Sequence, residues 1–260
     1  MLLTRDLDDT IRRCEIAGIR SGIATASRLT PHVGVAGTEI AGGLAAFTGV
    51  DSPLSQVYGI VARVTGGDIA AITTFYASRG AAPRVFVSPL ADPSLGLELA
   101  AAGYAPCEYE NVLVSDAFEQ HARADERIAA AADLDAWALA SAQAFTGRDS
   151  LEPADVAIAK LIAYSAGVCS LEARENGAIV ATAAMDFRDG CAGLFAGSTL
   201  PAFRGHGWQI AMTRDRIARA HNGGARFMRA TARPMSVSER NLHRCGFVTL
   251  YTRALWERKR

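Results

Sequence analysis

The sequence predicts a mixed α/β protein made of two similar halves. Segments with helical periodicity alternate with short apolar stretches of strand character, which is the pattern of helices packed on a sheet. The chain has 260 residues and is half hydrophobic, which is enough for two domains of ordinary size. The order of elements in the first half also recurs in the second. We therefore expect each half to be a central mixed β-sheet flanked by helices.

The first predicted element is a helix from about residue 6 to residue 28. Leu7, Ile11 and Cys14 are spaced so that they share one apolar face. Small and β-compatible residues follow in segment 33–50, which predicts a strand and a turn.

Segment 66–80 predicts a second helix. Ile69, Ile72 and Tyr76 fall on one face, and Gly80 provides a C-terminal stop. A short buried strand, a helix and another strand are then expected from the sequences "PRVFVSP", "DPSLGLELAAAGY" and "EYENVLV". Asp92 or Ser94 is the expected cap of the helix among them.

The polar, alanine-rich segment 115–134 is the expected boundary between the halves, which we place at 1–122 and 123–260. Beyond it the pattern repeats. Aligning Gly103 with Gly246, an offset of 143 residues, also aligns Gly80 with Gly223, Leu99 with Leu242 and Tyr104 with Phe247 without a gap. An internal duplication explains these matches economically.

Composition narrows the classes of function. Lys plus Arg and Asp plus Glu both number 27, so the chain lacks the net positive charge expected of a protein that binds nucleic acid or an anionic membrane. The five cysteines are scattered singly, which indicates a reducing compartment and predicts neither disulfides nor a metal site. The N-terminus does not resemble a signal peptide, and no apolar stretch is long enough to span a bilayer. We expect a cytoplasmic protein.

The sequence "TLPAFRGHGWQIA" carries the main functional signal. Glycines ahead of a helix let backbone amides converge on an anion, and the positive end of the helix dipole favours phosphate. Arg204 can add a charge-assisted contact, and so can His206, although an exposed loop histidine without a role is also open. At the same offset the first half has Val61, Ala62 and Val64 in place of Arg204, Gly205 and Gly207. A loop needed only to turn the chain would have been kept in both halves.

Two familiar phosphate loops do not match this stretch, since it is neither GxxxxGK[ST] nor GxGxxG followed by a strand and an acid. Instead, "STLPAFRGHGWQIAMTRDRIARA" resembles the acetyl-CoA-binding segment of the GNAT superfamily of N-acetyltransferases, with the loop pattern [QR]xxGx[GA]. Arg204 occupies its first position and Gly207 its fourth, while Gln209 stands where Gly or Ala is usual. The stretch "SVSERNLHRCGFVTLYTR" resembles the helix and strand that follow, including the GF pair Gly246 and Phe247.

The resemblance covers roughly residue 127 to the C-terminus, and the first half resembles a decayed second copy. It implies two tandem GNAT-like domains with acetyl-CoA as the cosubstrate. The strand before the loop is expected to splay from its neighbour and to present its backbone to the pantetheine arm. The implied cofactor-binding residues are Ser198, Thr199, Leu200, Arg204, Gly205, His206, Gly207, Trp208, Gln209, Ser238 and Asn241.

The implied reaction is direct attack of a substrate amine on the acetyl thioester. Deprotonating an ammonium of ordinary lysine pKa costs roughly 4–5 kcal/mol at neutral pH, so a general base is expected. Glu172 and Asp186, on strands expected beside the cofactor strand, are the candidates, and a solvent-facing carboxylate is the alternative for each. Many family members have a tyrosine acid five residues before the Phe of the GF pair, where this chain has Leu242. Tyr251 is the candidate to replace it.

Two functional interpretations stay open. The second half is an N-acetyltransferase acting on a primary amine of a small molecule or peptide, or it is an inactive acyl-CoA-binding sensor or structural module. The acceptor amine would be the partner in the first case. We expect no nucleic-acid or membrane partner, and either a monomer or a homodimer.

Overall fold

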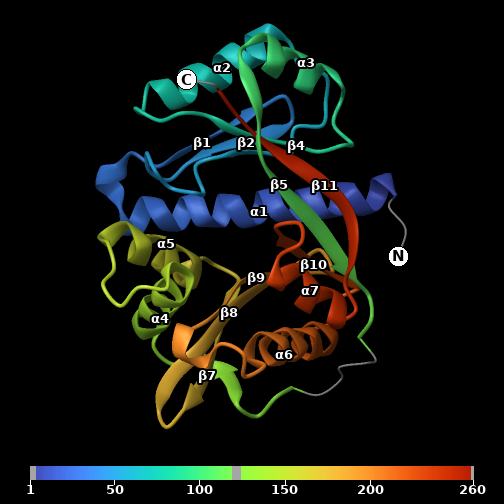
Figure 1. Cartoon of the computed structure of the whole chain (residues 1–260). Coiled ribbons are helices and arrows are strands. Elements are labelled where there is room, and N and C mark those ends of the chain that lie inside the picture. Colours follow the sequence, from blue (N-terminus) through green and yellow to red (C-terminus); the bar gives the residue numbers. More distant parts are fainter. Residues whose placement is uncertain (1–3, 119–123, 259–260) are drawn as a thin grey trace. The chain divides into compact units, whose positions relative to one another are not determined.

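The computed structural model describes residues 4–118 and 124–258 (Figure 1). Its α-helices are α1 (Arg5–Leu29), α2 (Gly66–Ala77), α3 (Ser94–Ala101), α4 (Leu134–Thr146), α5 (Pro153–Tyr164), α6 (Trp208–Asn222) and α7 (Val237–Arg244). Its strands are β1 (Ala36–Ile40), β2 (Gly43–Phe47), β3 (Val57–Tyr58), β4 (Arg84–Val87), β5 (Tyr104–Ser115), β6 (Ile128–Ala130), β7 (Val168–Glu175), β8 (Ala178–Arg188), β9 (Cys191–Thr199), β10 (Phe227–Ala232) and β11 (Val248–Arg258). Among the described residues, no helix combines the length and apolar character needed to cross a bilayer.

The chain forms two compact units, and each unit is discontinuous in sequence. Unit 1 contains the described residues up to Cys14 and the range Val112–Leu250. Unit 2 contains Glu15–Asn111 and the described residues from Tyr251 onward. The divisions fall inside α1, β5 and β11. The predicted boundary between residues 122 and 123 lies outside the described residues.

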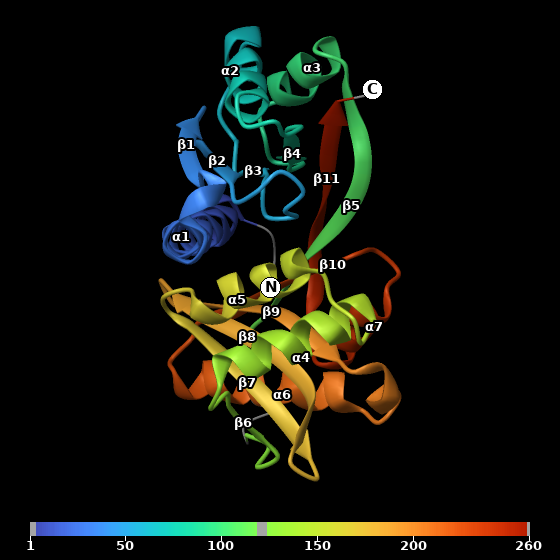
Figure 2. The same ribbon diagram turned by 90° about the vertical axis from the view of Figure 1, so that its left-hand side faces the viewer.

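In unit 1, the strands follow the order β5-β10-β9-β8-β7-β6. β9 and β10 are parallel, whereas β9, β8, β7 and β6 pair in antiparallel fashion, so the sheet is mixed. Helices α4 and α5 cover one face of this sheet and α6 covers the other (Figure 2). Trp137 of α4 is fully buried and donates through Nε1 to the carbonyl of Leu171, 2.8 Å away, so it belongs to the core.

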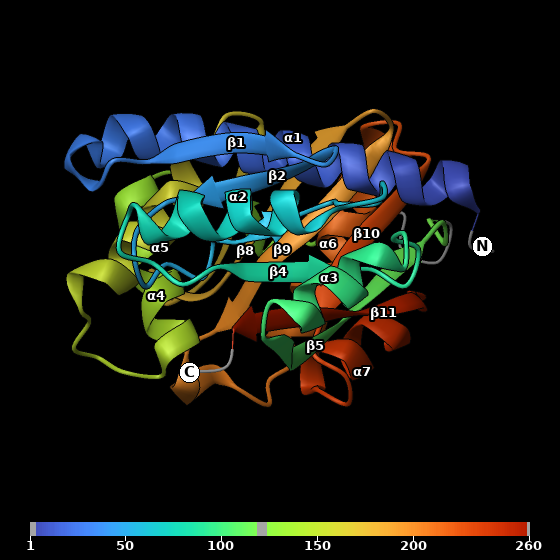
Figure 3. The same cartoon turned by 90° about the horizontal axis from the view of Figure 1, so that it is seen from above.

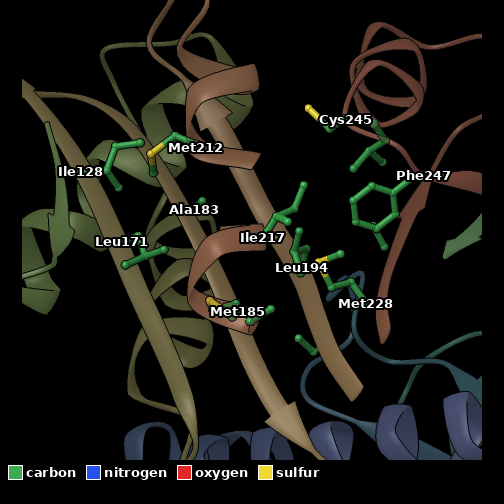
Figure 4. Close-up of a cluster of buried hydrophobic side chains, with 14 of the residues drawn as sticks. Ile128, Leu171, Ala183, Met185, Leu194, Met212, Ile217, Met228, Cys245 and Phe247 are labelled. Carbon is green, nitrogen blue, oxygen red and sulfur yellow. The ribbon is translucent and has the colours of Figure 1, made fainter. Parts of the chain in front are cut away.

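The larger core of unit 1 lies between α6 and the sheet. Met212 and Ile217 of α6 pack against strand residues that include Leu171 and Leu194 (Figure 4). Phe247, the aromatic residue of the GF pair, is buried in the same cluster. α6 is therefore held along its length, while the loop residues 204–207 just before it are exposed.

In unit 2, the strand order is β1-β2-β3-β4-β11-β5. β3 and β4 are parallel, and β1, β2 and β3 pair in antiparallel fashion, so this sheet is mixed as well. Figure 3 shows α2 and α3 lying over the strands. The predicted face of α2 is confirmed, because Ile69, Ile72 and Tyr76 are all buried in the core of this unit. Gly80 adopts a left-handed φ of 69° just beyond the helix, as expected of a stop.

The element bounds reproduce the predicted duplication. At the offset of 143 residues, α3 coincides with α7, and β4 falls within β10. β5 likewise corresponds to β11, and α2 to α6. The two halves differ just before the equivalent helices α2 and α6. The second half has the long strand β9 there, whereas the first half has the two-residue strand β3. Two related α/β folds with mixed sheets are therefore confirmed.

Candidate functional site

The adjacent strands β9 and β10 of unit 1 part from each other. β9 and β10 pair in parallel from Cys191 to Leu194 on β9 and from Phe227 to Ala230 on β10. β9 then continues to Thr199 without further pairing to β10 among the described residues. Its other edge stays paired with β8 as far as Thr199. The predicted splay of the strand before the loop is thus present, and it begins after Leu194.

A β-bulge lies where the splay begins. Ala184 of β8 pairs with Phe195 and Thr182 pairs with Ser198, so two β9 residues lie opposite one β8 residue. Ala196, one of those two, has a left-handed φ of 49°. Beyond the bulge, the side chains of Ser198 and Thr182 are hydrogen bonded at 2.7 Å. The bulge thus redirects the strand residues predicted to meet a cofactor.

The loop that follows is shaped by two glycines. Gly205 and Gly207 have φ values of 84° and 82°, which side chains disfavour, and Gly207 is the residue before the first turn of α6. No side chain caps this helix, and no hydrogen bond from the amides of residues 205–208 to any described residue occurs. Successive amides in such a turn form an anion-binding concavity. The residues predicted to bind a phosphate therefore present free donors at a helix N-terminus.

Arg204 holds the loop in place by hydrogen bonds and also gives it a positive charge. Its Nε donates to the carbonyl of Thr199 at 3.2 Å, and its Nη2 donates to the carbonyl of Ala144 in α4 at 2.8 Å. The residue is exposed, and so is His206. The guanidinium thus joins the end of β9 to the end of α4 while remaining at the surface beside the open amides.

Trp208 fixes the start of α6. Its side chain is buried in the core of unit 1, and its indole Nε1 donates to Glu175 Oε1 at 2.9 Å. The guanidinium carbon of Arg127 lies 4.8 Å from the centre of the ring. The side chain of Trp208 therefore anchors the helix in the core of unit 1.

Gln209 and Asn241 join α6 to α7. Asn241 Nδ2 donates to Gln209 Oε1 at 2.7 Å, which holds the glutamine side chain against the second helix. Ser238 is half-buried on α7. These contacts explain how a glutamine is accommodated where the loop pattern usually has glycine or alanine.

The equivalent helix end in unit 2 is closed. Asp68 accepts hydrogen bonds from the amide and the hydroxyl of Thr65 at 2.8 and 2.7 Å, and the Val64 amide donates to Ser94 Oγ. The side-chain and backbone hydrogen bonds from Thr65 lower the pKa of Asp68. A carboxylate of the chain itself thus occupies the end of α2, where the second half leaves its amides open.

The two candidate bases are both buried, not solvent-facing. On β7, Glu172 Oε1 accepts from Arg174 Nε at 2.8 Å, while its Oε2 is buried without a hydrogen-bond partner in the described structure. On β8, Asp186 Oδ2 accepts from Arg188 Nε at 3.0 Å, and its Oδ1 lies 3.9 Å from Arg229 Nη2.

The candidate acid has a different location. Tyr251 belongs to unit 2, whereas the loop, the splayed strand and both carboxylates belong to unit 1. Leu242, at the position where the family pattern has tyrosine, is buried in the core of unit 1. The roles of Tyr251, Glu172 and Asp186 stay predictions.

Sequence reasoning missed one residue of this site. Arg216 is buried on α6 and donates to the carbonyls of Ala184 and Phe195, the two residues paired at the bulge. A signal was present, because Arg216 lies one helical turn from Met212 and Ala220, which are both buried. A charged residue at core-facing spacing marks a buried polar contact.

Comparison with known structures identifies the fold. No protein-family model and no curated protein sequence matches the chain. Among solved structures, a GCN5-related N-acetyltransferase from Kribbella flavida is 17% identical with a TM-score of 0.61, and the match covers 92% of this chain and 96% of that one. An acetyltransferase from the GNAT family of Colwellia psychrerythraea is 13% identical with a TM-score of 0.55, covering 86% and 84%. A tandem GNAT protein from the clavulanic acid biosynthesis pathway is 13% identical with a TM-score of 0.58, covering 84% and 79%.

These similarities extend over most of the chain and include a protein with two GNAT domains. The chain therefore has the tandem fold of the GNAT acetyltransferases, as the sequence resemblance predicts. At these levels of identity the similarity defines the fold alone.

Proposed function

We propose that the chain is an N-acetyltransferase that moves an acetyl group from acetyl-CoA to a primary amine of a small molecule or peptide. The observation that supports this most strongly is the coincidence of two features in unit 1. The splayed segment of β9 offers unpaired backbone, and it leads directly into a loop whose amides are open at the N-terminus of α6. An extended arm ending in a pyrophosphate matches both features.

Each part of this site has a task in the proposed reaction. Gly205, Gly207 and the first turn of α6 would bind the pyrophosphate through backbone amides, with Arg204 adding charge. The backbone of β9 beyond the bulge would hold the pantetheine arm, and one of its amides would stabilise negative charge on the thioester oxygen. Acetyl-CoA supplies the acetyl group in activated form as a thioester.

The chain must also remove a proton from the amine. We favour Glu172 of the two carboxylates as the acceptor of this proton, because its Oε2 is buried and has no hydrogen-bond partner in the described structure. Both oxygens of Asp186 lie near arginine nitrogens, whereas Glu172 has an arginine at Oε1 alone among the described residues. No residue of unit 1 is assigned as proton donor to the departing thiolate, because the candidate Tyr251 belongs to unit 2.

Binding of acyl-CoA without transfer is the second candidate. It is favoured by Leu242, a buried residue that cannot donate a proton at the position where the family pattern has tyrosine. An ordinary thiol has a pKa near 8.5, so a thiolate leaves without full protonation at a modest cost. Acetyl transfer therefore does not require a tyrosine at this position, and we favour it over binding alone.

The test is calorimetric titration of the full chain with acetyl-CoA and with CoA. We expect one equivalent to bind, because of the two equivalent helices α2 and α6 only α6 lacks a capping box within the described residues. Arg204→Glu should weaken binding at least about tenfold, because it replaces attraction by repulsion and removes the braces to Thr199 and Ala144.

Arg63→Glu is the matched control. It makes the same change of charge in the corresponding exposed loop of unit 2, and it should leave the affinity for acetyl-CoA unchanged. Equal losses in the two variants would refute the assignment to unit 1. Thiol release with a panel of primary amines then separates the two candidates, because a binding module gives saturable binding and no amine-dependent thiol.

A further inference from the structure

Arg216 is a buried cation with no carboxylate among its hydrogen-bond partners in the described part of the chain. It is 4% exposed, and burial lowers the pKa of its guanidinium to about 10. Its donors go to the carbonyls of Met212, Ala184 and Phe195 at 3.1–3.2 Å, with a longer contact of 3.4 Å to Thr213 Oγ1. The adjacent Asp215 is paired with Arg219 instead. Burying a charge among neutral oxygens is costly, so packing alone does not account for this residue.

The location of the Arg216 guanidinium explains why this charged side chain is buried. Its Nη1 bridges the carbonyls of Ala184 and Phe195, which belong to β8 and β9 at the point where the register shifts. A bulge disrupts the local ladder of hydrogen bonds, and buried carbonyls left unpaired are unfavourable. A planar guanidinium can serve two carbonyls at once, which an ammonium does less well.

The guanidinium also lies against the splayed strand. A Cβ atom added to Gly197 would lie 3.3 Å from Arg216 Nη2. Phe195 is the first β9 residue beyond the pairing with β10, and its carbonyl is engaged by Arg216. The arginine therefore fixes the backbone at the start of the splay.

We propose that Arg216 is a positioning residue that keeps β9 splayed from β10. By holding the carbonyls of Ala184 and Phe195, it fixes the bulge and leaves the backbone from Ala196 to Thr199 available for the thioester arm of acyl-CoA. The part of this inference that concerns acyl-CoA rests on the proposed function. The part that concerns the bulge does not.

Arg216→Met tests the proposal, with Arg214→Met as the matched control. Arg214 lies on the same helix and is exposed, so the control makes the same chemical change away from the bulge. We expect Arg216→Met to weaken acetyl-CoA binding at least about tenfold and to raise its KM more than it lowers kcat, because a prearranged binding surface is lost. Arg216→Lys should recover part of the affinity. Arg214→Met should bind as the wild type does.

Hydrogen exchange followed by mass spectrometry, without ligand, gives the independent measurement. Deuterium uptake should rise in peptides covering residues 180–200 of Arg216→Met and Arg216→Lys, more in the former, and remain unchanged in peptides covering α4 and α5. A less stable Arg216→Met that binds acetyl-CoA with wild-type affinity overturns the positioning role. Uniform uptake across unit 1, or equal effects in Arg214→Met, overturns it as well. If the wild-type chain does not bind acetyl-CoA, the proposed function fails, and the exchange data alone decide whether Arg216 holds the bulge.

Discussion

At the scale of single residues, the buried arginines of the two units have different kinds of partner. Arg216 in unit 1 serves backbone carbonyls at the bulge. In unit 2, Arg253 pairs with Glu15 at 2.8 Å and with Glu110 at 2.7 Å, and its guanidinium carbon lies 4.1 Å from the centre of the Phe86 ring. Burial alone would lower the pKa of Arg253, but the two carboxylates raise it overall. This ionic cluster joins α1, β5 and β11 within unit 2.

We expect Arg253→Met to destabilise the protein by about 3–5 kcal/mol, because it leaves two carboxylates facing each other in a largely buried place. Urea unfolding followed by circular dichroism measures the change. Arg84→Met is the control, since Arg84 pairs with the more exposed Glu257 and Glu108, and it should cost about 1 kcal/mol or less. Similar losses of unfolding free energy in the two variants would show that the Arg253 cluster stabilises the protein no more than the exposed ion pairs of Arg84 do.

At the scale of elements, the functional contrast lies in how two equivalent helices begin. α2 starts with Thr65 and Asp68 hydrogen bonded to each other, so a carboxylate of the chain stabilises the helix dipole. α6 starts at Trp208, and Gly207 before it has a left-handed conformation and provides no capping side chain. α6, which has no capping side chain, is the helix that we propose binds a phosphate.

Gly207→Ala should therefore affect both stability and binding. Its φ of 82° costs an alanine roughly 1–2 kcal/mol, and relaxing that strain would turn the loop amides away from a common point. We expect a lower midpoint in thermal unfolding and at least about tenfold weaker binding of acetyl-CoA by calorimetry.

Gly224→Ala separates these two effects. Gly224 follows the same helix at its other end, has a φ of 75°, and has open space where a Cβ would lie. It should lower the unfolding midpoint by a comparable amount and leave the affinity unchanged. Weaker binding in Gly224→Ala would mean that the loss in Gly207→Ala reflects stability alone.

At the scale of the whole molecule, the halves of the sequence are not the compact units of the structure. β4 in unit 2 pairs with Ala254–Glu257 of β11, which comes from the end of the chain. A fragment of residues 1–122 would lack this strand and Arg253, so β4 would have an open edge and Glu15 and Glu110 would lose their shared arginine.

We therefore expect fragment 1–122 to aggregate or remain unfolded when produced alone, and to become soluble when produced together with fragment 123–260. Size-exclusion chromatography and circular dichroism distinguish the two states. A monomeric fragment 1–122 with a cooperative thermal transition would show that the first half does not require the terminal strand.

By itself, the sequence determined the order of the elements, the duplication and the glycine-rich loop before α6. Those features are local, because helical spacing places Ile69, Ile72 and Tyr76 on one face, and a glycine pair such as Gly205 and Gly207 signals a left-handed turn wherever it occurs. The pairing of β11 with β4, the burial of Arg216 and the separation of Tyr251 from the loop into another unit were decided only by the tertiary structure. These depend on which backbone groups and charges are left unpaired once distant strands meet, and no local pattern records that.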